Sequence, residues 1–135
     1  MKYLLDVNAL VALAFVDHVL HDRARGWVQG LSSTDELATC AITELGFVRI
    51  LSRAPQYGFE VKEAIAALWR LKKSGKIRFS FVADDQDASQ LPSWVSTPKQ
   101  ITDGHLVQLA RVHHAMIATL DRGIPGAFLI PGAEP

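Results

Sequence analysis

Four acidic residues of this 135-residue chain stand where the surrounding pattern favours uncharged side chains: Asp6, Glu44, Asp103 and Asp121. Four carboxylates that meet in one place cannot all ionise without a counter-charge. A hard cation such as Mg²⁺ or Mn²⁺ supplies that charge, because it takes oxygen ligands and keeps several waters. Such an ion activates water and stabilises charge on a phosphodiester during in-line attack. These residues therefore indicate metal-dependent phosphodiester hydrolysis, provided that the fold brings them together.

Two of the acids lie at the ends of apolar runs that predict strands. Asp6 interrupts the run that starts at Tyr3, and Asp121 comes shortly after the run that ends at Thr119. Each also has a purely structural interpretation. Asp6 is suited to cap a following helix, and Asp121 is suited to a turn that includes Gly123. The pattern alone leaves both interpretations open.

The other two acids fall in the first turns of expected helices. Asp103 follows Thr102, which we expect to be a helix N-cap. In that position the charge of Asp103 interacts favourably with the helix dipole. Glu44 shares a helix face with Phe47 and Leu51, although a position near a helix start would also leave it partly exposed. An acid on an apolar stripe needs a partner, since its desolvation costs on the order of a few kcal/mol.

The elements that must position these acids alternate along the chain. We expect strands over 3–5, 37–40, 77–82, 115–119 and 127–130, helices over 10–14, 20–29, 42–53, 60–73 and 101–113, and a loop over 84–99. Short apolar strands separated by helices predict an α/β fold with a parallel sheet that is covered on both faces. The ligand site of such a fold lies beyond the carboxyl ends of its strands. The length predicts one domain, 1–135.

Composition narrows the setting in which this chemistry would take place. There are 14 basic and 14 acidic residues, so the formal charge is zero, which argues against a broad phosphate-binding face. One cysteine, Cys40, excludes an internal disulfide and fits a reducing, cytoplasmic setting. No apolar run reaches the roughly 18 residues of a membrane span. Asp6 comes too early for a secretory signal, and no glycine-rich nucleotide loop is present.

Four stretches of the sequence, taken in order, carry a family resemblance: 4–10 (LLDVNAL), 39–49 (TCAITELGFVR), 101–106 (ITDGHL) and 118–123 (ATLDRG). Through them the chain resembles the PIN-domain ribonucleases, specifically the VapC-type toxins of bacterial toxin–antitoxin pairs. The resemblance spans nearly the whole chain. It implies a three-layer α/β/α domain with a central, mostly parallel sheet, and a metal-dependent endoribonuclease that uses Mg²⁺ or Mn²⁺.

The resemblance also assigns roles to residues. Asp6, Glu44, Asp103 and Asp121 match the acidic quartet, with Asp6 and Asp103 as the expected direct metal ligands. Asp121 would bind a second ion or act through water, and Glu44 would hold a metal water or act as general base.

Further roles are expected around the quartet. Asn8 and Thr102 match groups that orient carboxylates. Arg49, Arg53 and Arg122 are candidates for RNA binding because they lie near Glu44 and Asp121 in sequence. The implied partners are an RNA substrate, a second copy of the chain and a small antitoxin, with DNA bound only through that antitoxin and no membrane.

Five basic residues between positions 70 and 78 invite a different interpretation: Arg70, Lys72, Lys73, Lys76 and Arg78. They could contact RNA phosphates. Cations also favour a helix C-terminus, however, and we expect this helix to end near Gly75. We therefore interpret the cluster as a helix end. The resemblance places this segment near a sheet edge, away from the acids.

Two features of the sequence bear on alternative functions, a phosphatase and a non-catalytic binding module. Asp84 and Asp85 are similar to the paired acids of haloacid-dehalogenase phosphatases, but that family requires an aspartate where this chain has Asn8. Gly104 departs from the PIN pattern and puts the rigidity of Asp103 in doubt, since glycine in a helical turn costs up to about 1 kcal/mol. Together with the zero net charge, it leaves open a non-catalytic RNA- or protein-binding module.

Overall fold

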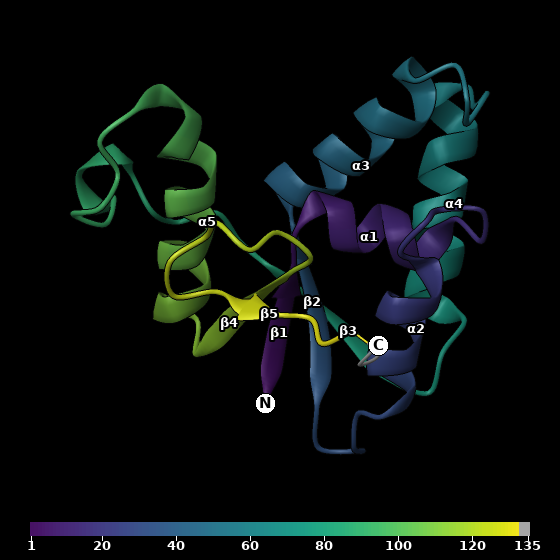
Figure 1. Ribbon diagram of the computed structural model, residues 1–135, viewed down its shortest axis with the longest axis horizontal. Coiled ribbons are helices and arrows are strands. Elements are labelled where there is room, and N and C mark those ends of the chain that lie inside the picture. The colour runs from purple at the N-terminus through teal and green to yellow at the C-terminus, as the bar shows by residue number, and fades with distance from the viewer. Residues whose placement is uncertain (133–135) are drawn as a thin grey trace.

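The computed structural model describes residues 1–132, and five parallel strands form its centre (Figure 1). The strand order across the sheet is β3-β2-β1-β4-β5. The strands are β1 (Lys2–Leu5), β2 (Glu36–Cys40), β3 (Arg78–Val82), β4 (Ala115–Thr119) and β5 (Phe128–Leu129). The expected parallel sheet is confirmed, and the last strand is shorter than its apolar run predicted.

Five helices and two short 3-10 turns connect these strands. The helices are α1 (Val7–Ala14), α2 (His21–Gln29), α3 (Ala41–Arg53), α4 (Val61–Lys73) and α5 (Ile101–Val112). The 3-10 turns η1 (Ala88–Gln90) and η2 (Pro98–Gln100) lie in the polar segment before α5, as the proline-rich composition there favours short turns over long helices.

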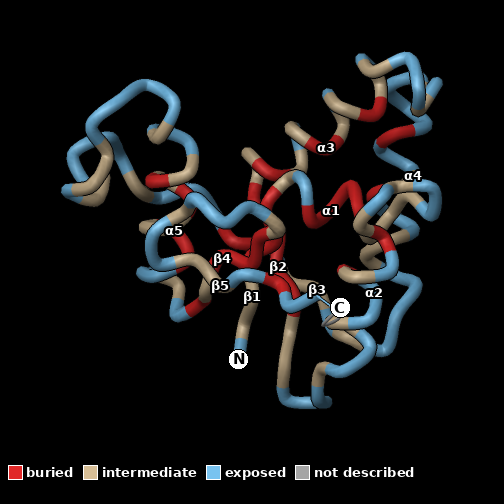
Figure 2. Tube along the Cα trace, viewed as in Figure 1, coloured by how far each residue is buried: buried red, intermediate tan, exposed pale blue. Residues whose placement is uncertain are grey.

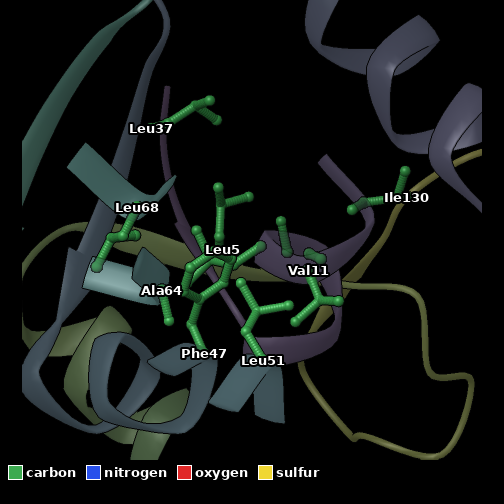
Figure 3. Close-up of a cluster of buried hydrophobic side chains, with 11 residues drawn as sticks. Leu5, Val11, Leu37, Phe47, Leu51, Ala64, Leu68 and Ile130 are labelled. Atoms are coloured by element: carbon green, nitrogen blue, oxygen red, sulfur yellow. The ribbon is translucent and has the colours of Figure 1, made fainter. Parts of the chain in front are cut away.

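The helices cover both faces of the sheet, as the near-continuous apolar character of the strands requires. Consecutive strand residues point to opposite faces, so Leu5 packs with Leu37 under α1, α3 and α4, whereas Leu4 packs with Ala38 under α5. Figure 2 shows the buried residues concentrated along the sheet and on α1, and Figure 3 shows the larger core around Phe47. The expected three-layer α/β/α arrangement is confirmed.

The order of connections fixes where a ligand site can form. From β1 the chain passes through α1 and α2 to β2 on one side of β1, whereas from β3 it passes through α5 to β4 on the other side. The neighbouring carboxyl ends of β1 and β4 therefore lie at the point where the direction of winding changes. In open α/β sheets, ligands bind at such a point.

One local expectation is wrong. Thr102 is not the N-cap of α5, because the helix begins at Ile101 after the 3-10 turn, and Gln100 occupies the N-cap. On α4, Ala64 and Leu68 are buried, whereas the apolar side chains of Val61 and Ile65 are more than half exposed. Only the side of α4 that carries Ala64 and Leu68 packs on the core, so apolar residues beside that side lie at the surface.

Within residues 1–132, no helix has the length and apolar character needed to cross a membrane.

Candidate active site

Asp6 is a buried carboxylate at the carboxyl end of β1, and only 8% of its surface is exposed. Its Oδ1 accepts a hydrogen bond from the Ala9 backbone N–H at 2.8 Å and thereby caps α1. Its Oδ2 accepts a hydrogen bond from the Thr119 hydroxyl at the end of β4. The capping interpretation of Asp6 is thus correct, and it does not compete with a site role because the second oxygen faces the neighbouring strand.

Asp121 is tied to the same threonine. Its backbone N–H donates to Thr119 Oγ1 at 3.0 Å, and its Oδ1 accepts from the Gly123 backbone N–H at 2.9 Å. Thr119 is fully buried, whereas Asp121 is exposed. One hydroxyl therefore links the carboxylate at the end of β1 to the turn that carries Asp121.

Asp103 lies in the first turn of α5 and is partly buried. Burial raises its pKa, and the charge of Asp121 raises it further. Burial also raises the pKa of Asp6, and the charges of Asp103 and Asp121 add to that rise, against the lowering effect of the hydrogen bonds from Thr119 and Ala9. The three aspartates therefore lie close enough to repel one another.

This donor set fits a divalent cation by its chemistry. The carboxylates offer hard oxygen ligands, and their mutual repulsion is the condition that a bound cation relieves. Within residues 1–132, however, no three His, Cys, Asp or Glu side chains are already drawn together around one point as metal ligands. The aspartates thus share an electrostatic environment without forming a closed cage.

Glu44 occupies the first turn of α3, one turn beyond the end of β2. Its Oε2 accepts two hydrogen bonds, from the Thr39 hydroxyl at 2.5 Å and from Lys72 Nζ at 2.7 Å. The prediction that the basic segment lies away from the acids is wrong for Lys72, because the last turn of α4 packs beside the start of α3.

The two residues expected to orient carboxylates lie at the surface. Asn8 and Thr102 are exposed, and neither side chain makes a hydrogen bond within residues 1–132. Buried threonines on two strands donate to the acids instead, Thr119 to Asp6 and Thr39 to Glu44. A threonine inside an apolar strand was the only signal in the sequence that could have identified them.

The three arginines considered for RNA binding are also exposed, and none of them forms an ion pair with a residue of the described chain: Arg49, Arg53 and Arg122. Asp84 and Asp85 accept hydrogen bonds from His105 on α5 and from His113 directly after it, each at 2.9 Å. These pairs attach the segment after β3 to α5, which explains both acids without a phosphatase role.

The structure explains why residue 104 is a glycine. A Cβ at this position would lie 2.2 Å from Val95 Cγ2 and 3.6 Å from Trp94 Cη2. The segment before α5 therefore packs directly on the helical turn that carries Asp103. The absence of a side chain permits this contact, so the glycine is compatible with a firmly held Asp103.

Comparisons with known proteins place this geometry in context. The family model described as PIN domain matches residues 3–127. The chain is 39% identical to Ribonuclease VapC44 of Mycobacterium tuberculosis, over 98% of this chain and 94% of the relative. It is 40% identical to Ribonuclease VapC38 (90% and 86% covered) and 34% identical to Ribonuclease VapC29 (92% and 89%) of the same organism. A solved structure of VapBC2 from Rickettsia felis, bound to a DNA fragment from its promoter, has a TM-score of 0.65 at 15% identity and covers 96% of this chain and 97% of that chain, a likeness of fold.

Proposed function

The chain belongs to the PIN domain family, and we propose that it is an endoribonuclease toxin whose aspartates hold Mg²⁺ or Mn²⁺ at the carboxyl ends of β1 and β4. The observation that carries the proposal is geometric: the Thr119 hydroxyl at the end of β4 contacts both the Asp6 carboxylate and the Asp121 N–H. Burial raises the pKa of Asp6 and Asp103, and the charges of the neighbouring aspartates add to that rise. The three relatives compared above are all named ribonucleases, and this supports RNA as the substrate.

Asp6, Asp103 and Asp121 are the residues that would hold the cation. When bound, a divalent ion supplies positive charge beside a phosphodiester under attack and lowers the pKa of water. Thr119 orients Asp6 by its hydrogen bond and orients the turn of Asp121 through the Asp121 N–H. Burial of Asp6 excludes water from one side of the site, which strengthens the attraction between this carboxylate and any positive charge.

Glu44 is the proposed proton acceptor. Its Oε2 is occupied by Lys72 and Thr39, whereas its Oε1 accepts no hydrogen bond from residues 1–132. Oε1 is thus the atom that would take a proton from an attacking water. The exposed arginines Arg49, Arg53 and Arg122 are proposed to bind RNA phosphates near the acids, since a protein of zero net charge must attract RNA through local groups.

The partners that we propose are a small antitoxin and a second copy of the chain. The relatives' name VapC and the likeness to VapBC2 support an antitoxin, through which DNA would be bound indirectly. Three exposed apolar side chains on successive turns of α4, Val61, Ile65 and Trp69, support a homodimer. Apolar stripes of this kind are typical of protein interfaces.

Cleavage of end-labelled RNA by protein purified free of any antitoxin tests the proposal. We expect discrete cuts with Mg²⁺ or Mn²⁺ and none with EDTA. Asp6→Asn, prepared identically, should produce no cuts. Equal cutting by this variant would identify a contaminating nuclease. A protein that binds RNA but leaves every RNA intact in the presence of metal would favour a non-catalytic binding module.

A further inference from the structure

Lys72 is a partly buried cation that reaches Glu44 from another helix. The two residues are 28 positions apart, and Lys72 Nζ lies 2.7 Å from Glu44 Oε2. Only 17% of the Lys72 side chain and 24% of the Glu44 side chain are exposed. A charge-assisted hydrogen bond at this distance and burial has a defined geometry, unlike an exposed surface pair.

Two further contacts hold the pair in place. The Thr39 hydroxyl donates to the same Glu44 oxygen at 2.5 Å, and Lys72 Nζ lies 5.9 Å from the centre of the Phe81 ring. The other nearby cations face elsewhere: Lys73 lies over Trp69, and Arg78 pairs with Glu36. Lys72 is thus the member of the basic segment that is directed at an acid of the candidate site.

The acids of the site therefore divide into two groups. Asp6 and Asp121 are both tied to Thr119 at the end of β4, through the Asp6 carboxylate and the Asp121 N–H. Glu44 has its own cation, because its Oε2 accepts hydrogen bonds from Lys72 on α4 and from Thr39 on β2. The division follows from packing, because α4 brings an ammonium group to α3 but not to the ends of β1 and β4.

We propose that Lys72 is a positioning residue that holds Glu44 out of the cation site and leaves Asp6, Asp103 and Asp121 to bind the ion. This inference rests on the proposed function. The ammonium group and a divalent cation compete for the Glu44 carboxylate, and the ammonium is permanently present. Without Lys72, Glu44 becomes a fourth negative ligand, and cation affinity rises with the charge of the ligand set.

The test is a calorimetric titration of the full chain with Mn²⁺, starting from EDTA-treated and desalted protein. Lys72→Met removes the charge and keeps an unbranched side chain, and we expect Mn²⁺ to bind roughly tenfold more tightly. Lys72→Arg retains the charge and should bind like the wild type. Lys62→Met is the matched control: it removes the same charge from the same helix at a side chain that is 85% exposed.

The double variant Lys72→Met with Glu44→Gln identifies the route of the effect. If the gain in affinity passes through the Glu44 carboxylate, the amide abolishes it and affinity returns to the wild-type value. Equal affinities in wild type, Lys72→Met and Lys62→Met would overturn the inference and leave the proposed function intact. A gain that persists in the double variant would also overturn it. Absence of Mn²⁺ binding in every protein would instead contradict the proposed cation site, and the inference with it.

Discussion

At the residue scale, the site combines a firmly held carboxylate with unrelieved repulsion. Asp6 accepts hydrogen bonds on both oxygens, and these favour its ionised form. Burial together with the charges of Asp103 and Asp121 nevertheless raises its pKa. The protein thus tolerates an unfavourable cluster of charges at one point, which is a common feature of functional sites.

Removing one of these charges should stabilise the metal-free protein. Asp6→Asn keeps a good N-cap for α1, because asparagine caps helices about as well as aspartate. It also removes the desolvation and repulsion that raise the pKa of Asp6. We expect the free energy of unfolding in EDTA at neutral pH to rise by about 1 kcal/mol. Urea denaturation measures it, and a clear loss of stability would show that the charge is better compensated than the geometry indicates.

Thr119 should matter for cation binding although it is not a ligand. Thr119→Val removes the hydroxyl that donates to Asp6 and accepts from the Asp121 N–H. Loss of such an orienting group typically lowers metal affinity or activity by roughly 10–100-fold. Mn²⁺ titration measures the loss, and Thr119→Ser, which retains the hydroxyl, should restore most of the affinity. A valine variant with wild-type affinity would contradict the orienting role.

The sequence predicts the acids of the site better than their surroundings. Asp6, Asp103 and Asp121 interrupt local patterns, so their unusual positions are visible along the chain. The donors Thr39, Thr119 and Lys72 are separated from their acceptors by 5, 113 and 28 residues. Thr119 and Lys72 depend on which strands and helices become neighbours, and Thr39 depends on a bend from β2 into α3.

At the element scale, the segment before α5 supports the turn that carries Asp103. Pro92, Trp94 and Val95 pack against Gly104, where no Cβ fits without movement of Val95. This arrangement places a helix turn, rather than a free loop, next to the ends of β1 and β4. Gly104, which the sequence suggested would make Asp103 less rigid, is the residue that permits this close packing.

Gly104→Ala should therefore destabilise the protein despite the better helix propensity of alanine. The new methyl group would lie 2.2 Å from Val95 Cγ2, and overpacking of this kind costs about 1–3 kcal/mol, against a gain of at most about 1 kcal/mol from propensity. Chemical denaturation measures the balance. In the double variant with Val95→Ala the contact is removed, so much of the loss should be recovered. A single variant more stable than the wild type would show that Val95 moves away freely.

The helices and strands were predictable because their apolar periodicity is strong. Features that depend on neighbouring elements are not visible in the local pattern. The start of α5 depends on the preceding 3-10 turn rather than on Thr102, and the exposure of Val61 and Ile65 depends on which side of α4 meets the core. Local pattern thus predicts an element but does not decide how much of its apolar face is covered.

At the scale of the whole molecule, cation binding should depend on pH in a definite direction. The pKa values of Asp6 and Asp103 are raised above 3.8 in the folded protein, which therefore binds more protons than the unfolded chain in this range. The cost of their repulsion is present above the raised pKa values and disappears as pH falls through them towards 3.8. Protons and cations compete for the same oxygens, so Mn²⁺ affinity should fall as pH is lowered through that window. Calorimetry at several pH values checks this, and affinity that stays constant to pH 3.8 would contradict it.

The exposed stripe on α4 makes a prediction about assembly. Ile65 is 53% exposed, between Val61 and Trp69, so a charge at this position should not disturb the core. If the stripe forms the proposed homodimer, Ile65→Lys should shift the protein from dimer to monomer in sedimentation experiments, with no change in the circular dichroism spectrum. A variant that stays dimeric would place the interface elsewhere.

The proposed function requires that Asp6 and Asp121, beyond the ends of β1 and β4, and Asp103 on α5 form one divalent-cation site. The decisive measurement is Mn²⁺ binding to wild type and to Asp103→Asn at neutral pH, with folding checked by circular dichroism. We expect saturable binding by the wild type. In the folded variant we expect the affinity to fall by more than about 100-fold, which exceeds the loss caused by removing a residue that only orients a ligand. Equal binding by both proteins would contradict the claim.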